Sequence, residues 1–153
     1  MSKTIAYTAS DAAFRHALYQ FIVARGHVPK LRELAAALSH PEKIVRAGIR
    51  RLAQLHIVVL QPQSAEILRA APFWAVPTAF RVRSGQRAWW ASCVWDALAI
   101  PAMLRRDTRI ATACPCCDSP MELAIRNGRL LRSPGIIHFA VPASRWYRDV
   151  VFT

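Results

Sequence analysis

Apolar residues recur every three or four positions through the first third of the chain, which is the spacing of helices with one buried face. This pattern predicts a first helix over residues 10–25, with Ser10 as its N-cap and Gly26 just beyond its last turn. The apolar stripe of this predicted helix comprises Phe14, Leu18, Phe21 and Ile22.

Two further helices are predicted after the break at Pro29, over residues 31–38 and 41–54. The segment Ser39–Glu42 has the pattern of a capping box that opens the third helix. One face of this helix is apolar, and the other face carries Lys43, Arg46 and Arg50. A cationic helix face of this kind either contacts nucleic-acid phosphates, as a recognition helix does, or is a solvated surface.

The hydrophobic pattern changes from helical spacing to extended segments after the third helix. Residues 57–60 and 66–68, joined by the turn Gln61–Ser64, predict a β-hairpin. Three helices followed by a hairpin are typical of a winged-helix-like domain, which we assign to residues 1–70. A linker interrupted by prolines is predicted next, over residues 71–77.

The second predicted domain, residues 71–153, combines one helix with several strands. Its strand candidates are residues 78–83, 109–113, 121–125, 130–131 and 136–141. Asn127–Gly128 is a hairpin signal, Pro101 is expected to end the helix, and residues 144–150 predict a short closing helix. The predicted class is therefore α+β, with a winged-helix-like domain followed by an α+β domain that has a mainly antiparallel sheet.

Composition supports a folded protein with a basic surface. Apolar residues make up 54% of the chain and charged residues 20%, which argues against disorder. The net charge is +12, and residues 1–56 and 57–153 each contribute +6, so the charge is not focused in one DNA-binding patch. The short, polar residues 1–10 predict no targeting signal, and the chain contains no apolar run of about 18 residues. Its four cysteines therefore indicate thiols of a cytoplasmic protein, with no membrane partner.

The stretch richest in chemistry places a thiol and a carboxylate three residues apart, at Cys93 and Asp96. On a helix these two residues would share one face, with Ser92 as the N-cap and Cys93 in the first turn, where the dipole favours a negatively charged sulfur. Burial would favour the protonated form of the carboxyl, because three tryptophans surround it in the sequence. These tryptophans are Trp89, Trp90 and Trp95. The alternative interpretation is a core cysteine beside a capping or salt-bridged aspartate.

The other three thiols lie within four residues, at Cys114, Cys116 and Cys117. Cys114 and Cys117 have the spacing of a zinc knuckle, but a structural zinc site needs four ligands and the chain has no second pair. Zinc is therefore disfavoured, and two interpretations stay open: a turn with free thiols, or auxiliary soft-metal ligands near Cys93. His138 lies in an apolar segment and is interpreted as a core histidine.

Residues 87–102 resemble the central motif of the organomercurial (alkylmercury) lyase family. The motif has an aromatic lead, then Cys-x-x-Asp-x-Leu, then an apolar-Pro-Ala step, as in Cys93 to Ala102 here. The resemblance continues through residues 109–115, 138–142 and 146–153, and with the N-terminal region it covers nearly the whole chain.

The resemblance implies cleavage of carbon–mercury bonds. It makes Cys93 the first of two thiolates that hold the mercury and Asp96 the carboxyl that handles the proton, giving a hydrocarbon and bound Hg(II). It implies an organomercurial substrate, no organic cofactor, and mercuric reductase as a possible acceptor of Hg(II). Cys114 matches a family cysteine that is not the main catalytic thiol.

The same resemblance places the second essential cysteine directly after Thr153. We therefore expect a truncated or degenerate relative with impaired turnover, unless the fold brings a thiol of Cys114–Cys117 within a few ångströms of Cys93. The alternative function is a winged-helix DNA-binding or soft-metal-sensing regulator without turnover. In that alternative the DNA-contacting residues are Lys43, Arg46 and Arg50.

Overall fold

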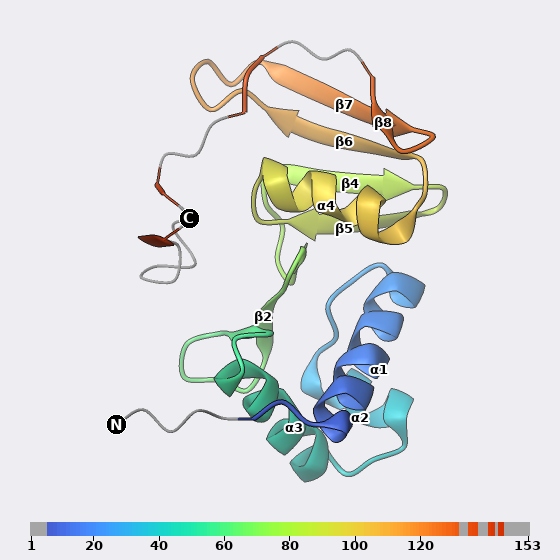
Figure 1. Cartoon of the computed structure of the whole chain (residues 1–153), viewed down its shortest axis with the longest axis vertical. Helices are drawn as coiled ribbons and strands as arrows, with labels where there is room; N and C mark the ends of the chain where they lie inside the picture. Colours follow the sequence, from blue (N-terminus) through green and yellow to red (C-terminus); the bar gives the residue numbers. More distant parts are fainter. Residues whose placement is uncertain (1–5, 132–134, 138–140, 143, 146–153) are drawn as a thin grey trace.

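The computed structural model describes residues 6–131, 135–137, 141–142 and 144–145, which form four helices and one sheet (Figure 1). The helices are α1 (Ala9–Arg25), α2 (Leu31–Leu38), α3 (Glu42–Gln54) and α4 (Val94–Leu104). The strands are β1 (Val59–Leu60), β2 (Ile67–Ala70), β3 (Phe73–Trp74), β4 (Phe80–Ser84), β5 (Arg87–Ala91), β6 (Thr108–Ala113), β7 (Pro120–Arg126) and β8 (Arg129–Leu130). The strand order is β1-β2-β3-β5-β4-β6-β7-β8 with every pairing antiparallel, so the predicted α+β class with a mainly antiparallel sheet is confirmed.

The first helix begins at Ala9, and its N-cap is Thr8, so the prediction of Ser10 as the cap was wrong. The Thr8 hydroxyl accepts a hydrogen bond from the Asp11 amide (3.2 Å), and the Asp11 carboxylate accepts one from the Thr8 amide (2.8 Å). This reciprocal capping box needs an acidic residue three positions after the cap, which Thr8 has and Ser10 lacks. Gly26 ends the helix in the left-handed conformation (φ 85°), as predicted.

The second and third helices match the predicted ranges, but the capping box predicted between them does not form. Ser39 is the C-cap of α2 in a left-handed conformation (φ 53°), and Pro41 is the N-cap of α3 without a side-chain cap. Ser39 ends one helix, so it does not begin the next. The core-facing residues of the two helices are Leu31, Leu34, Val45, Ile49 and Leu52.

The predicted hairpin is confirmed as β1 paired with β2, but the predicted linker over residues 71–77 was wrong. Phe73–Trp74 forms β3, which pairs with β2 and, through Trp74 opposite Trp90, with β5. Both β3 side chains are buried, so this short strand makes one sheet out of the two predicted regions. The division into domains at residues 70 and 71, and the winged-helix assignment, stay predictions.

The fourth helix packs on β4 and β5, on the face of the sheet that carries its buried side chains (Figure 1). Ala97 and Ile100 of α4 are fully buried. The helix continues through Pro101 to Leu104, so the prediction that it ends near Pro101 was wrong. Proline removes one backbone hydrogen bond, and the buried apolar face of α4 compensates for this loss.

The strands predicted over residues 109–113, 121–125 and 130–131 are confirmed as β6, β7 and β8. Asn127 and Gly128 make the β7–β8 turn, both at positive φ (49° and 72°), as a two-residue hairpin requires. His138, and parts of the strand predicted over 136–141 and the helix predicted over 144–150, lie outside the described residues. None of the described helices combines the length and the apolar character of a membrane span.

Candidate functional site

Cys93 lies where β5 ends and α4 begins. It is itself the N-cap of α4, in an extended conformation (φ −148°), and its carbonyl accepts a hydrogen bond from the Ala97 amide (2.9 Å). The prediction that Ser92 caps the helix with Cys93 in the first turn was therefore wrong by one residue. The Cys93 thiol is half-buried, and it makes no side-chain capping bond to the first amides of α4.

Asp96 lies in the first turn of α4 and is 6% exposed. Its Oδ2 atom accepts a hydrogen bond from the Ser92 hydroxyl and lies 3.1 Å from Arg69 Nη2, which also lies 3.4 Å from Oδ1. Asp96 follows Cys93 by three positions, so both lie at the start of α4. The structure thus places a free thiol at the N-cap and, in the first turn, a buried carboxylate that is held by a hydroxyl and a guanidinium.

Arg69 is the part of this arrangement that sequence reasoning missed. It lies on β2, 27 residues before Asp96, and the β2–β3–β5 pairing brings the two together. Within the described part of the chain, its buried Nε has no hydrogen-bond partner. No local pattern distinguishes this arginine from the other basic residues of the chain, so the sequence offered no signal for it.

The three tryptophans of this stretch have different surroundings. Trp89 is 2% exposed, its Nε1 donates to the Ile22 carbonyl (2.9 Å), and its ring lies 6.2 Å from that of Phe73. Trp90 stacks with the Arg81 guanidinium at 5.3 Å, and Trp95 is 55% exposed. The reason is that residues 87–91 form a strand, in which neighbouring side chains point to opposite faces.

The remaining three thiols lie in the loop Cys114–Ser119 between β6 and β7. The Cys114 amide donates to the Ser119 carbonyl (2.9 Å), and the Asp118 amide donates to the Cys114 carbonyl (2.8 Å). Cys114 is half-buried, whereas Cys116 and Cys117 are exposed, and all are free. In the described residues no three or more Cys, His, Asp or Glu side chains converge as a metal site would require, so there is no zinc-type ligand set there.

The thiol loop and Cys93 lie at the same end of the sheet. Ala91 pairs with Phe80 and Ala111 pairs with Arg81, so β5 and β6 flank β4 and both end beyond its first residues. Neighbouring strands are about 4.8 Å apart, which puts the ends of β5 and β6 about 10 Å from each other. The loop is therefore a neighbour of the Cys93 site with β4 between them (Figure 1).

The cations of α3 lie in the part of the fold formed by α1, α2 and α3, whereas Cys93 lies between β5 and α4. Lys43 and Arg50 are exposed, and Arg46 is half-buried.

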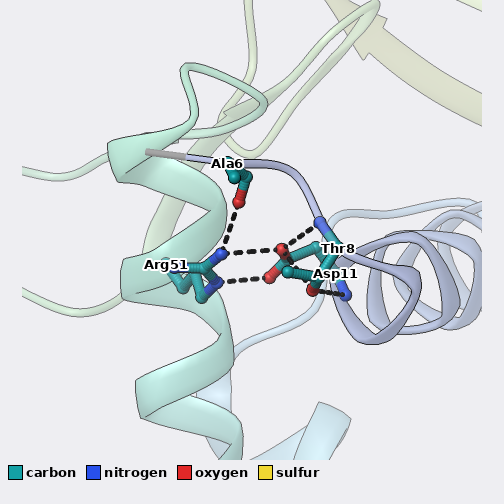
Figure 2. A network of polar contacts seen from close by, with 4 residues as sticks. All are labelled: Ala6, Thr8, Asp11 and Arg51. Carbon is teal, nitrogen blue, oxygen red and sulfur yellow. Dashed lines mark hydrogen bonds and ion pairs between the residues drawn. The ribbon is translucent and has the colours of Figure 1, made fainter. Parts of the chain in front are cut away.

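The adjacent Arg51 belongs to a different network, shown in Figure 2, that links α3 to the start of α1. Its Nε lies 2.6 Å from Asp11 Oδ1, while its Nη2 lies 3.0 Å from Oδ2 and 2.7 Å from the Ala6 carbonyl. The Arg51 and Thr8 hydrogen bonds lower the pKa of Asp11 to about 2.

The family model for alkylmercury lyase, MerB, matches residues 73–153, which is more than half of the chain. The chain belongs to the alkylmercury lyase family. The matched stretch contains Cys93, Asp96 and the thiol loop, whereas Arg69 and the cations of α3 precede it.

Among solved structures, the mercury-bound form of MerB2 has the same fold as the present chain, with a TM-score of 0.59 and 24% sequence identity. The similarity covers 78% of this chain and 59% of that chain, so the present chain spans less than two thirds of the length of MerB2. At this identity the likeness shows the fold alone. No curated protein matches the chain.

Proposed function

We propose that this chain is an organomercurial lyase-like protein whose reacting groups are Cys93 and Asp96. The observation that carries the proposal is their geometry: a free thiol at the N-cap of α4 and a buried carboxylate in the first turn of that helix, inside the stretch that matches the family. Hg(II) is a soft ion that prefers thiolate sulfur to nitrogen or oxygen, which suits Cys93 as its ligand.

The proposed reaction starts with exchange at mercury. The Cys93 thiol attacks R–Hg–X, forming a sulfur–mercury bond, releasing X⁻ and passing its proton to the adjacent Asp96 carboxylate. Asp96 then gives this proton to the mercury-bound carbon, so that the carbon–mercury bond breaks, R–H leaves and Hg(II) stays on sulfur. Arg69 Nη2 lies 3.1 Å from Asp96 Oδ2, so the guanidinium holds this carboxyl in place at the start of α4.

A second thiolate on mercury would make the bound carbon more basic. Residues 1–153 do not include the cysteine that the family pattern places directly after Thr153. We therefore propose that these residues by themselves bind organomercurials but cleave them slowly. In this proposal the protein works in the cytoplasm, where thiols stay reduced, and mercuric reductase accepts the Hg(II) product.

The test is to incubate phenylmercury with residues 1–153 and excess glutathione, and to measure bound mercury by mass spectrometry and benzene in the headspace. We expect one phenylmercury per chain to be bound at Cys93, so that the number of bound mercury atoms falls by one in Cys93→Ser and is unchanged in the matched control Cys116→Ser. A chain extended by its natural downstream residues, if these begin with cysteine, should release benzene much faster. Unchanged mercury binding by Cys93→Ser would contradict the assignment.

The exposed cations of α3 support a second proposal, DNA binding by a winged-helix-like region over residues 1–70. Lys43 and Arg50 are exposed on the solvent side of α3, where their side chains can contact phosphates. DNA binding that weakens with salt and disappears when Lys43 and Arg50 are both changed to alanine would support this proposal. Salt-independent or absent binding would eliminate it.

A further inference from the structure

The loop Cys114–Ser119 holds its cysteines in a fixed turn. Its arms are β6 and β7, paired up to Ala113 opposite Pro120, and the two backbone hydrogen bonds from the Cys114 and Asp118 amides close the loop. Asp118 takes a positive φ (55°), which lets the chain reverse directly after Cys117. The spacing between Cys114 and Cys117 is therefore set by backbone structure rather than by flexible side chains.

Cys114 and Cys117 lie in the same closed turn, because the Asp118 amide donates to the Cys114 carbonyl across it (2.8 Å). The Cys117 sulfur lies 3.1 Å from the Ser119 hydroxyl. Cys116 is exposed, and no group of three metal-binding side chains exists in the part of the chain that the structure describes. The loop thus presents a pair of thiols, at Cys114 and Cys117, in one closed turn.

We propose that Cys114 and Cys117 form a second soft-metal site, a two-sulfur clamp for a thiophilic ion such as Hg(II). Zinc requires four ligands, and the described residues around the loop supply only two. A soft ion that accepts two thiolates needs no more. Binding forms two sulfur–metal bonds and releases the two thiol protons, so no oxidant or reductant takes part.

This clamp is separate from the proposed lyase chemistry. The strand β4 lies between the loop and Cys93, and neither Cys114 nor Cys117 is needed for proton transfer at Asp96. Whether the loop binds Hg(II) can therefore be tested independently of carbon–mercury cleavage.

The test titrates Hg(II) into the 153-residue Cys93→Ser protein in excess glutathione, with bound mercury counted by native mass spectrometry. We expect one Hg(II) per chain to resist the competing monothiol. Adding Cys114→Ser or Cys117→Ser should weaken this binding by at least about 100-fold, because the second sulfur–metal bond forms within one molecule. Adding Cys116→Ser, the matched control in the same loop, should leave it unchanged.

Two outcomes would overturn the clamp. One is a Cys93→Ser protein that retains no Hg(II) against glutathione, and the other is an equal loss in the Cys116→Ser control. Circular dichroism establishes whether each variant is folded. If the Cys93→Ser protein is not folded, the count is made in the original chain, where Cys114→Ser should reduce the bound Hg(II) from two ions to one.

Discussion

Two buried aspartates, Asp11 and Asp96, are each paired with an arginine distant in sequence, yet their surroundings differ. Asp11 is bound by two nitrogens of Arg51 and by the amide and hydroxyl of Thr8, and Arg51 also donates to a backbone carbonyl (Figure 2). Asp96 is bound by one nitrogen of Arg69 and by the Ser92 hydroxyl, while Arg69 Nε is unpartnered among the described residues.

We propose that the difference separates a structural ion pair from one placed for chemistry. The partners of the Asp11 carboxylate, Arg51 and Thr8, fix the start of α1 against α3. The Asp96 carboxylate has fewer partners and lies in the first turn of α4, three positions after the free thiol of Cys93. In this proposal the same kind of residue pair serves stability in one region and proton transfer in the other, depending on what surrounds it.

The largest expected effect is the loss of protonolysis in Asp96→Asn. Asparagine keeps the size of the side chain and its contact with Ser92, but it cannot carry a proton to carbon. Benzene release from phenylmercury, measured in the headspace with excess thiol, should fall by at least about 100-fold, the usual contribution of general acid–base catalysis. Mercury binding should persist, and Asp11→Asn should leave the rate of the folded protein unchanged. Equal losses in both variants would show that the comparison is wrong.

The next effect is the loss of stability in Asp11→Asn. The change removes the charge opposite Arg51 and weakens the capping box at Thr8, so both the link from α1 to α3 and the helix start are affected. We expect the melting temperature to fall by several degrees in thermal unfolding followed by circular dichroism. An unchanged melting temperature would show that the network in Figure 2 contributes little to stability.

The stabilisation by Asp11 should also depend on pH with a definite sign. Its pKa is lowered from 3.8 to about 2, so the folded state favours the ionised carboxylate, and the stabilisation is complete only above the unfolded-state value. The gap in unfolding free energy between the original chain and Asp11→Asn should be constant from pH 5 to 7 and shrink as the pH falls toward about 2. Urea unfolding across this range checks the trend. A difference in unfolding free energy that increases as the pH falls would contradict this prediction.

The smallest effect is expected for the exposed pair of Arg109 and Glu122. Their atoms lie 3.0 Å apart, but both side chains are more than half exposed, at 64% and 56%. Solvent screens such a pair, so Glu122→Gln should change the unfolding free energy by no more than about 0.5 kcal/mol. Urea unfolding at neutral pH measures this change, and a larger loss would place the pair closer to Asp11 and Arg51 in importance.

The sequence predicted the features that depend on near neighbours. The apolar stripe of α3, the turn at Asn127–Gly128 and the spacing of Cys93 and Asp96 are local patterns, and the structure has each of them. The strand β3 was missed because a strand of two residues is too short to show an alternation of apolar and polar positions. Its partner β5 is also distant in sequence. The strand β5 was not among the predicted strands, because residues 87–91 were considered only as the aromatic lead to the Cys93 helix.

The partners of Asp96 show the same limit within the candidate site. Ser92 was identified near the carboxylate, although as a cap, because it lies four residues away. Arg69 contacts Asp96 only because of strand pairing across the sheet, and no spacing rule connects residues that far apart. Local chemistry can thus be predicted from the sequence, whereas the charge that surrounds it requires the fold.

The two-residue strand β3 has a consequence for attempts to isolate parts of this protein. It lies between β2 and β5, and residues 71–153 expressed alone would lose β2 from one side of it. The backbone groups of Phe73–Trp74 would then form a bare sheet edge beside two large apolar side chains. Exposed apolar edges of this kind recruit strands from other molecules. The β1–β2 hairpin therefore also acts as a cover that keeps the β3 edge of one molecule from pairing with the sheet of the next.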